Sequence, residues 1–220
     1  MYITNSLITY TYRIIYLVIC GIGLFMHIDF GDFDENIRMF SFFTLQMNLV
    51  CFITYIILAR ETAIELKHPV SASIHRNRFL NLRGMVLLAI IIVFLAYNFV
   101  LRNTGFTMLK GCPTTITVND IYVHYLVPAM TFLDWLFFQP KGNFTIIDPF
   151  IWLILPLGYY CIVNIKTVFT SAGYPYYFIN IDELGLNTVL NNAFLFMIIC
   201  LTLGYLIVIF DRLLKHLNKK

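Results

Sequence analysis

Long, continuous apolar runs dominate the pattern of hydrophobic and polar positions along this chain. A helix that crosses a bilayer needs roughly 17–25 residues of this kind. Six runs reach that length, at about 9–28, 39–59, 84–101, 118–138, 146–165 and 189–210. None shows the two-faced alternation that marks a membrane strand. The pattern therefore predicts an all-α integral membrane protein, a single domain over residues 1–220 with six transmembrane helices.

The composition favours the same class of protein. Of the 220 residues, 60% are hydrophobic and 12% are charged, and the mean hydropathy is +0.78. Such a chain has too little polar surface to cover a water-soluble globule, so the lipid bilayer is its expected partner. No basic residue precedes the first apolar run within residues 1–12, so we expect this run to be a retained helix and not a cleaved signal peptide.

The distribution of lysine and arginine predicts the orientation. Cytoplasmic loops of membrane proteins carry an excess of these residues. One side of the predicted bundle carries most of them: Arg60, Lys67, Arg76, Arg78, Arg83, Lys141, Arg212, Lys215, Lys219 and Lys220. Both termini are therefore expected to be cytoplasmic. The net charge of +3 follows from this asymmetry and calls for no nucleic-acid partner. Richness in Ile, Phe, Tyr, Asn and Lys suggests an AT-rich bacterial genome, and hence the plasma membrane.

Several polar residues fall in the outer half of the predicted bundle. They are Thr44, Asn48, Asn98, Asp120, His124, Tyr159, Tyr160, Asn191 and Asn192. Thr44 lies about six residues below the outer end of its helix, or roughly 9 Å along the axis, and His124 is at about the same depth. A polar group that faces lipid without a partner is costly. We therefore expect these side chains to enclose one cavity that opens toward the outer face.

Asp120, His124 and Pro128 recur at intervals of four residues and so share one stripe of the helix 118–138. Pro128 cannot donate a hydrogen bond to the carbonyl of His124, so a kink is expected beside the imidazole. Pro156 should act in the same way at Trp152. Asp120 has two possible roles, orienting the His124 ring or capping the outer end of the helix.

Asp134 lies about ten residues below His124, at the inner interface that Trp135 marks. Arg83 enters the membrane from the same side, and Asp134 and Arg83 are predicted to form a structural ion pair. Gly84 is expected to let two helices pack closely. Arg13 is expected to extend its side chain to the inner interface.

Several blocks of the sequence resemble a known family in their order and spacing. They are RMFSFFTLQMN (38–48), LRG (82–84), HYLVP (124–128) followed by Asp134-Trp135, PLGY (156–159) and YPYYF (174–178). Together they look like the bacterial branch of the androgen-induced-gene family of six-helix membrane proteins. Its vertebrate members cleave fatty acid esters of hydroxy fatty acids with a threonine on the second helix and a histidine on the fourth. The resemblance implies that Thr44 and His124 are the catalytic pair and that no cofactor is needed.

This chemistry needs the two side chains in contact. A threonine hydroxyl is a poor nucleophile until a base takes its proton, and neutral His124 within about 3 Å could do so. Thr44 would then form an acyl-threonine from a lipid ester that enters from the outer leaflet. Asn48, Asn98 or a tyrosine hydroxyl such as that of Tyr159 could stabilise the oxyanion.

Other interpretations of these residues stay open at this point. The Thr44 hydroxyl could bond the carbonyl of its own preceding turn, and His124 could be structural. His27 could join His124 and Asp120 around Zn²⁺ in a metal-dependent hydrolase. The cavity could also hold an amphiphile in a non-catalytic lipid-binding or transport protein. The loop 174–176 could be an aromatic interface anchor or a lid.

Overall fold

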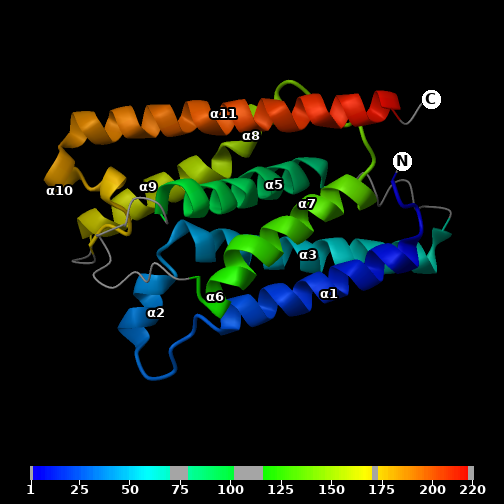
Figure 1. The fold of residues 1–220 in the computed structure, drawn as a ribbon, viewed down its shortest axis with the longest axis horizontal. Coiled ribbons are helices and arrows are strands. Elements are labelled where there is room, and N and C mark those ends of the chain that lie inside the picture. The colour runs from blue at the N-terminus through cyan, green and yellow to red at the C-terminus, as the bar shows by residue number, and fades with distance from the viewer. Residues whose placement is uncertain (1, 70–78, 102–115, 170–172, 218–220) are drawn as a thin grey trace.

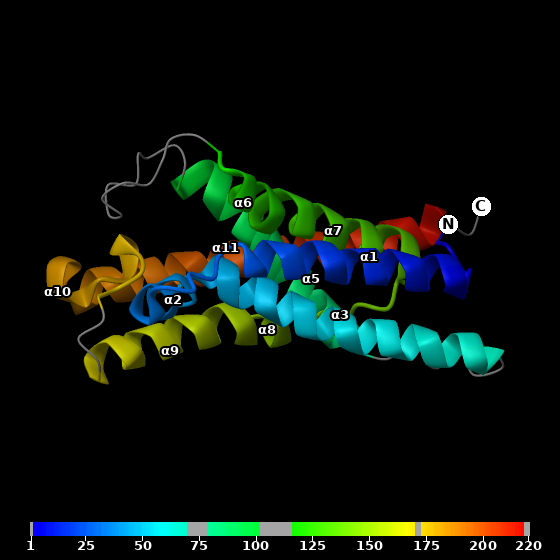
Figure 2. The ribbon, with the colours of Figure 1, turned by 90° about the horizontal axis from the view of Figure 1, so that it is seen from below.

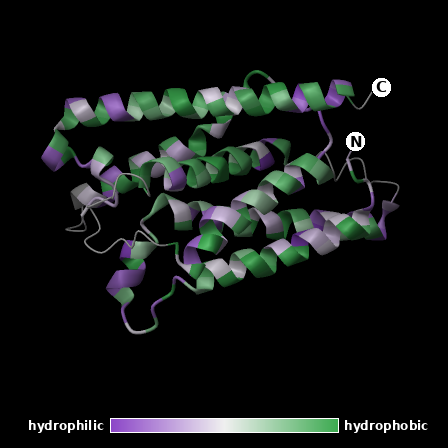
Figure 3. Cartoon of the chain, viewed as in Figure 1, coloured by the Kyte–Doolittle hydropathy of each residue, from purple (hydrophilic) through white to green (hydrophobic). Residues whose placement is uncertain are grey.

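The computed structural model describes residues 2–69, 79–101, 116–169 and 173–217. Every regular element in these ranges is a helix. Five of the helical stretches are long and apolar enough to cross a membrane, or six if a bent pair of helices is counted as one span. Apolar residues cover most of their length in Figure 3. The chain is a multi-pass membrane protein. Part of the predicted basic loop, residues 70–78, lies outside the described residues.

The elements follow one another along the chain as helices joined by short connections. They are α1 (Ser6–Phe25), α2 (Phe33–Met39), α3 (Phe43–Lys67), α5 (Leu80–Leu95), η2 (Ala96–Leu101), α6 (Val118–Ile121), η3 (Tyr122–Leu126), α7 (Val127–Phe138), α8 (Asp148–Trp152), α9 (Ile154–Phe169), η4 (Tyr177–Ile179), α10 (Ile181–Leu184) and α11 (Leu186–Leu217). The continuous stretch α6–η3–α7 covers the same residues, 118–138, as the fourth predicted span.

Helices α1, α3, α5 and α7 lie side by side, and α11 runs along the edge of the bundle beside α8 and α5 (Figures 1 and 2). Helix α5 is the most enclosed of them, with Leu87, Leu88 and Ile90 almost fully buried. In contrast, α11 exposes large apolar side chains such as Phe194 and Leu195, as a lipid-facing helix does. Helix α1 begins and α11 ends at the same end of the bundle.

The second span differs from its prediction. The sequence predicted one helix from about residue 39, but the chain bends by 84° between α2 and α3. Helix α2 carries the charged residues Asp34, Glu35 and Arg38. Because burying charges in hydrocarbon is costly, the chain turns after α2, and the membrane-spanning helix begins after this turn. As a result α3 begins at Phe43, and Thr44 is the second residue of a helix instead of lying well inside one.

Irregular helical turns occur where the prolines were expected to act. A π-helical turn, η3, immediately precedes α7, in which Pro128 is the second residue. Near Pro156 the helix is interrupted at Leu153, between α8 and α9. A second π-helical turn, η2, continues α5. Turns of this kind are rare in proteins, and those that occur often lie at functional sites.

Gly84 lets α5 and α8 approach closely, as the sequence predicted. A Cβ atom at Gly84 would overlap the indole ring of Trp152, whose Nε1 would lie 2.6 Å away. Trp152 is fully buried and belongs to the main apolar core. It cannot move aside without disturbing that core.

We expect Gly84→Ala to lower the free energy of unfolding by about 1–3 kcal/mol, the usual cost of overfilling a packed core. Gly158→Ala is the matched control, because it also places alanine in a helix but meets no atom within 4 Å. Thermal or denaturant unfolding in detergent micelles would measure both. Equal stabilities of the two variants would contradict the close packing at Gly84.

Candidate functional site

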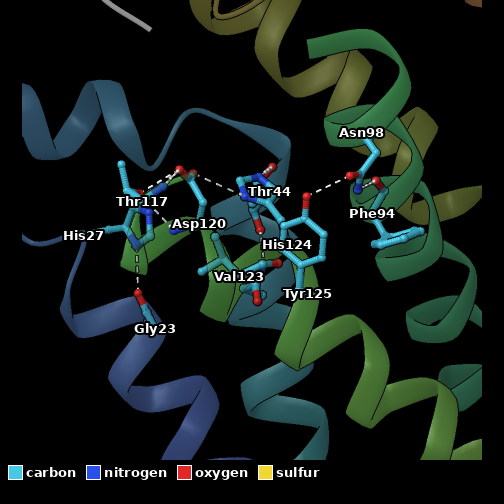
Figure 4. A network of polar contacts seen from close by, with 11 residues as sticks. Gly23, His27, Thr44, Phe94, Asn98, Thr117, Asp120, Val123, His124 and Tyr125 are labelled. Carbon is cyan, nitrogen blue, oxygen red and sulfur yellow. Dashed lines mark hydrogen bonds and ion pairs between the residues drawn. The ribbon is translucent and has the colours of Figure 1, made fainter. Parts of the chain in front are cut away.

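The structure brings Thr44 and His124 into contact. Thr44 lies in the first turn of α3, and His124 lies in the π-helical turn η3. Oγ1 of Thr44 is 3.3 Å from Nε2 of His124, and both residues are buried. Figure 4 shows the two side chains pointing toward each other from their separate elements. A hydroxyl and an imidazole nitrogen in this arrangement form a nucleophile and base pair in geometry.

Thr44 differs from other threonines of the bundle in its hydrogen bond. Five others use their hydroxyl to bond the carbonyl four residues earlier: Thr9, Thr62, Thr131, Thr167 and Thr202. That is the ordinary behaviour of threonine in a membrane helix. Thr44 has no preceding helical turn to bond, because α3 begins one residue before it. Its hydroxyl therefore faces another element.

Two other side chains lie against the His124 ring, one at its Nδ1 edge and one on its face. Nδ1 lies 3.5 Å from Oδ1 of Asp120, one helical turn above. This distance is long for a hydrogen bond, but it places a carboxylate where it favours a proton on Nδ1 and a free lone pair on Nε2. Tyr97, from η2, stacks on the imidazole with ring centroids 3.8 Å apart and planes 13° apart. No pattern in the sequence pointed to Tyr97, which lies next to the predicted Asn98.

Asp120 takes the capping role, one of the two roles that the sequence left open, and its other carboxylate oxygen faces His124. Oδ2 accepts hydrogen bonds from the backbone N–H and the hydroxyl of Thr117, at 2.9 and 2.7 Å, and this capping box begins helix α6. Oδ1 faces His124. The capping contacts fix the carboxylate, so its position beside the imidazole is set by the start of the helix.

Asn48 and Tyr159 hold the first turn of α3 in place. The Asn48 amide nitrogen donates to the carbonyls of Thr44, at 2.8 Å, and of Val123, at 3.2 Å. It thereby ties α3 to η3 beside both members of the pair. The Tyr159 hydroxyl donates to the carbonyl of Ser41 at 2.9 Å, in the turn that leads into α3. Both residues therefore position Thr44, and the Asn48 amide nitrogen is already engaged as a donor.

Other predicted residues lie away from the Thr44 hydroxyl. Asn98 accepts from the Tyr125 hydroxyl at 2.8 Å and donates to the carbonyl of Phe94 at 2.8 Å, on the far side of Tyr125 from Thr44 in Figure 4. Tyr160 and Asn192 bond backbone carbonyls of Val189 and Phe178. These contacts join helices and loops.

The arrangement gives the zinc alternative no support. Nδ1 of His27 lies 2.7 Å from the carbonyl oxygen of Gly23 on its own helix. Within the described ranges, no three His, Cys, Asp or Glu side chains are grouped so that they could hold a metal ion.

Tyr176 is a site residue whose role the sequence did not resolve. It lies in the connection before η4, and its side chain is buried against the start of α3. The Phe43 backbone N–H donates to its hydroxyl at 3.2 Å. Burial raises the pKa of Tyr176 to about 12, while hydrogen bonds with the Phe43 backbone and the Thr44 side chain act in the opposite direction. Tyr176 is therefore a neutral hydroxyl beside the Thr44 hydroxyl.

The predicted ion pair between Asp134 and Arg83 is wrong. Asp134 pairs with Arg13 instead, with Nε 3.0 Å from Oδ1 and both side chains buried. Arg13 also donates to the carbonyl of Leu58 and to the Thr62 hydroxyl. Helix α1 packs against both α3 and α7, so Arg13 reaches Asp134 inside the bundle, where its side chain is buried. Arg83 is also buried, and its Nε and Nη1 bond no atom of the described residues.

We expect Asp134→Leu to lower the free energy of unfolding by about 3–5 kcal/mol, because it leaves the Arg13 guanidinium buried without its carboxylate. Adding Arg13→Met should recover most of this loss, since two apolar side chains replace two charges. Unfolding of the single and double variants in micelles gives the coupling energy. Additive losses would show that the two charges do not interact.

Comparison of the chain with models of protein families, with curated proteins and with solved structures finds no match. The geometry of the site is therefore the basis for assigning a function. The resemblance noted in the sequence stays a prediction.

Proposed function

We propose that this protein is an intramembrane hydrolase of lipid esters in which Thr44 is the nucleophile and His124 is the base. The observation that carries this proposal is the 3.3 Å contact between Thr44 Oγ1 and His124 Nε2 in a buried site. The sequence resemblance independently names the same two residues. Asp120 and Tyr97 then hold the imidazole, one at its edge and one on its face.

The reaction balances with these two residues and water. Thr44 Oγ1 forms a bond to the ester carbonyl carbon while its proton passes to His124 Nε2. The bond to the alkoxy oxygen then breaks, and His124 returns the proton to the leaving alcohol. Water then attacks the acyl-threonine and gives a proton to His124, which passes it to Thr44 Oγ1 as the acid is released.

The start of α3 favours the negative charge that forms in these steps. The first N–H groups of a helix have no partner within the helix, and the helix dipole makes this end positive. Phe42, the N-cap of α3, forms no side-chain capping bond. Thr44 is the second residue of this 25-residue helix. An oxyanion formed on the carbon attached to Thr44 therefore lies near the positive end of α3.

The proposed membrane placement follows from the charge distribution. We place both ends of the chain in the cytoplasm of a bacterial cell, with the protein in the plasma membrane. The common end at which α1 begins and α11 ends would then be cytoplasmic, and the Thr44 site would lie in the outer half. A lipid ester from the outer leaflet would reach it with its acyl chains in the bilayer.

We expect Thr44→Val and His124→Gln each to lower kcat for a p-nitrophenyl ester by at least about 10³-fold, because each removes one half of a unit that acts together. The measurement is release of p-nitrophenol by the purified protein in detergent or in liposomes. Activity should be insensitive to chelators, which separates this mechanism from a zinc hydrolase.

Thr54→Val is the matched control, since Thr54 is buried on the same helix and lies away from His124 in sequence and depth. It should hydrolyse the ester as the parent protein does. Activity that survives Thr44→Val would contradict the proposed nucleophile. An inactive parent protein that still binds an amphiphile would favour the lipid-binding alternative.

A further inference from the structure

We propose that the Tyr176 hydroxyl is a catalytic group of the same site, which donates a hydrogen bond to the oxyanion formed on the acyl carbon. This inference rests on the proposed hydrolase function. It assigns to the buried connection before η4 a role beyond that of an interface anchor, and it identifies the donor that sequence reasoning sought among Asn48, Asn98 and Tyr159.

The position of the Tyr176 hydroxyl supports this role. It accepts a hydrogen bond from the backbone N–H of Phe43 at 3.2 Å, and it interacts with both the side chain and the backbone of Thr44. His124 also contacts the Thr44 oxygen. The Thr44 hydroxyl therefore lies between a base that can take its proton and a neutral phenol hydroxyl that can donate to a charge formed there.

The ring of Tyr176 is held so that the hydroxyl keeps this position. It stacks on Phe178 with centroids 5.2 Å apart and meets the edge of Phe42 at 5.5 Å. Tyr159 contacts it at 6.5 Å in a T-shaped arrangement. A donor that is fixed before the reaction costs no reorganisation when charge develops, which is the source of its catalytic effect.

Tyr176 is also in the correct protonation state. Its pKa is raised to about 12, chiefly by burial, so the hydroxyl keeps its proton throughout the neutral range. When Thr44 bonds the carbonyl carbon, the new oxyanion lies only two bonds from Oγ1, so the same donor reaches it with a small shift.

The other predicted candidates fit this role less well. Both carbonyl contacts of Asn48 are made by its amide nitrogen, and the Tyr159 hydroxyl donates to Ser41. Asn98 is engaged with Tyr125 and Phe94. Asn48 and Tyr159 would each have to break a bond that holds the site together before they could donate to an oxyanion, and Asn98 lies beyond Tyr125 from Thr44 (Figure 4).

The test is hydrolysis of a p-nitrophenyl ester by the full-length protein with Tyr176→Phe, which keeps the ring and removes the hydroxyl. We expect kcat to fall by about 10²–10³-fold, as on loss of one oxyanion donor, with KM nearly unchanged. Tyr177→Phe is the matched control in the same segment, where the side chain is exposed, and it should behave as the parent protein does. Thr44→Val is measured in parallel.

The outcomes separate this inference from the proposed function. If Thr44→Val abolishes hydrolysis but Tyr176→Phe keeps the parent kcat, the hydrolase stands and the role of Tyr176 is refuted. If the parent protein itself does not hydrolyse the ester, both proposals fail. A change in KM alone would show that Tyr176 only binds substrate.

A second variant covers the case in which Tyr176→Phe does not fold. Fluorotyrosine placed at position 176 keeps the ring packing and the hydroxyl but lowers the pKa of the phenol. The ionised phenolate cannot donate a hydrogen bond. As the pH rises, the variant should therefore lose activity at a lower pH than the parent protein does, so the upper limit of its pH–rate profile shifts downward. The same upper limit of the pH–rate profile in both proteins would overturn the inference.

Discussion

A polar side chain inside a bilayer must find a partner within the protein, because the surrounding hydrocarbon offers none. That constraint brings Thr44 and His124 together. Thr44 lies at the start of a helix, where no earlier turn can take its hydroxyl, and the imidazole of His124 lies 3.3 Å away. The same constraint sets Arg13 against Asp134, with its guanidinium bonds shared between α7 and α3. The first contact ties α3 to η3, and the bonds of Arg13 tie α1 to both α7 and α3.

Departures from regular helix geometry allow the first of these contacts. The 84° bend before α3 places Thr44 at a helix end, and the π-helical turn η3 carries His124. A second π-helical turn carries Tyr97, which covers the imidazole face. Regular helices through all three points would aim these side chains elsewhere, since one residue turns a helix by about 100°. The site therefore depends on local irregularity within a helical bundle.

Much of the fold follows from the sequence, because the apolar runs show where helices cross the membrane. Thr44 and His124 could be chosen from their depth and from the resemblance, and the geometry places them together. The partner of Asp134 could not be predicted, because the sequence does not show that α1 packs between α3 and α7. Tyr97 and Tyr176 were not identified for a related reason. Tyr97 stacks on a ring of another helix, and the connection that carries Tyr176 folds back onto the start of α3. Tertiary contacts of these kinds leave no periodic pattern in the sequence.

The most direct test of the Thr44–His124 unit is to trap the nucleophile. A fluorophosphonate lipid probe, incubated with the solubilised protein and mapped by mass spectrometry, reports which hydroxyl reacts. The account predicts an adduct on Thr44 that disappears in His124→Gln, because the base no longer removes the threonine proton. Labelling on another residue, or labelling of Thr44 at an unchanged rate without His124, would contradict it.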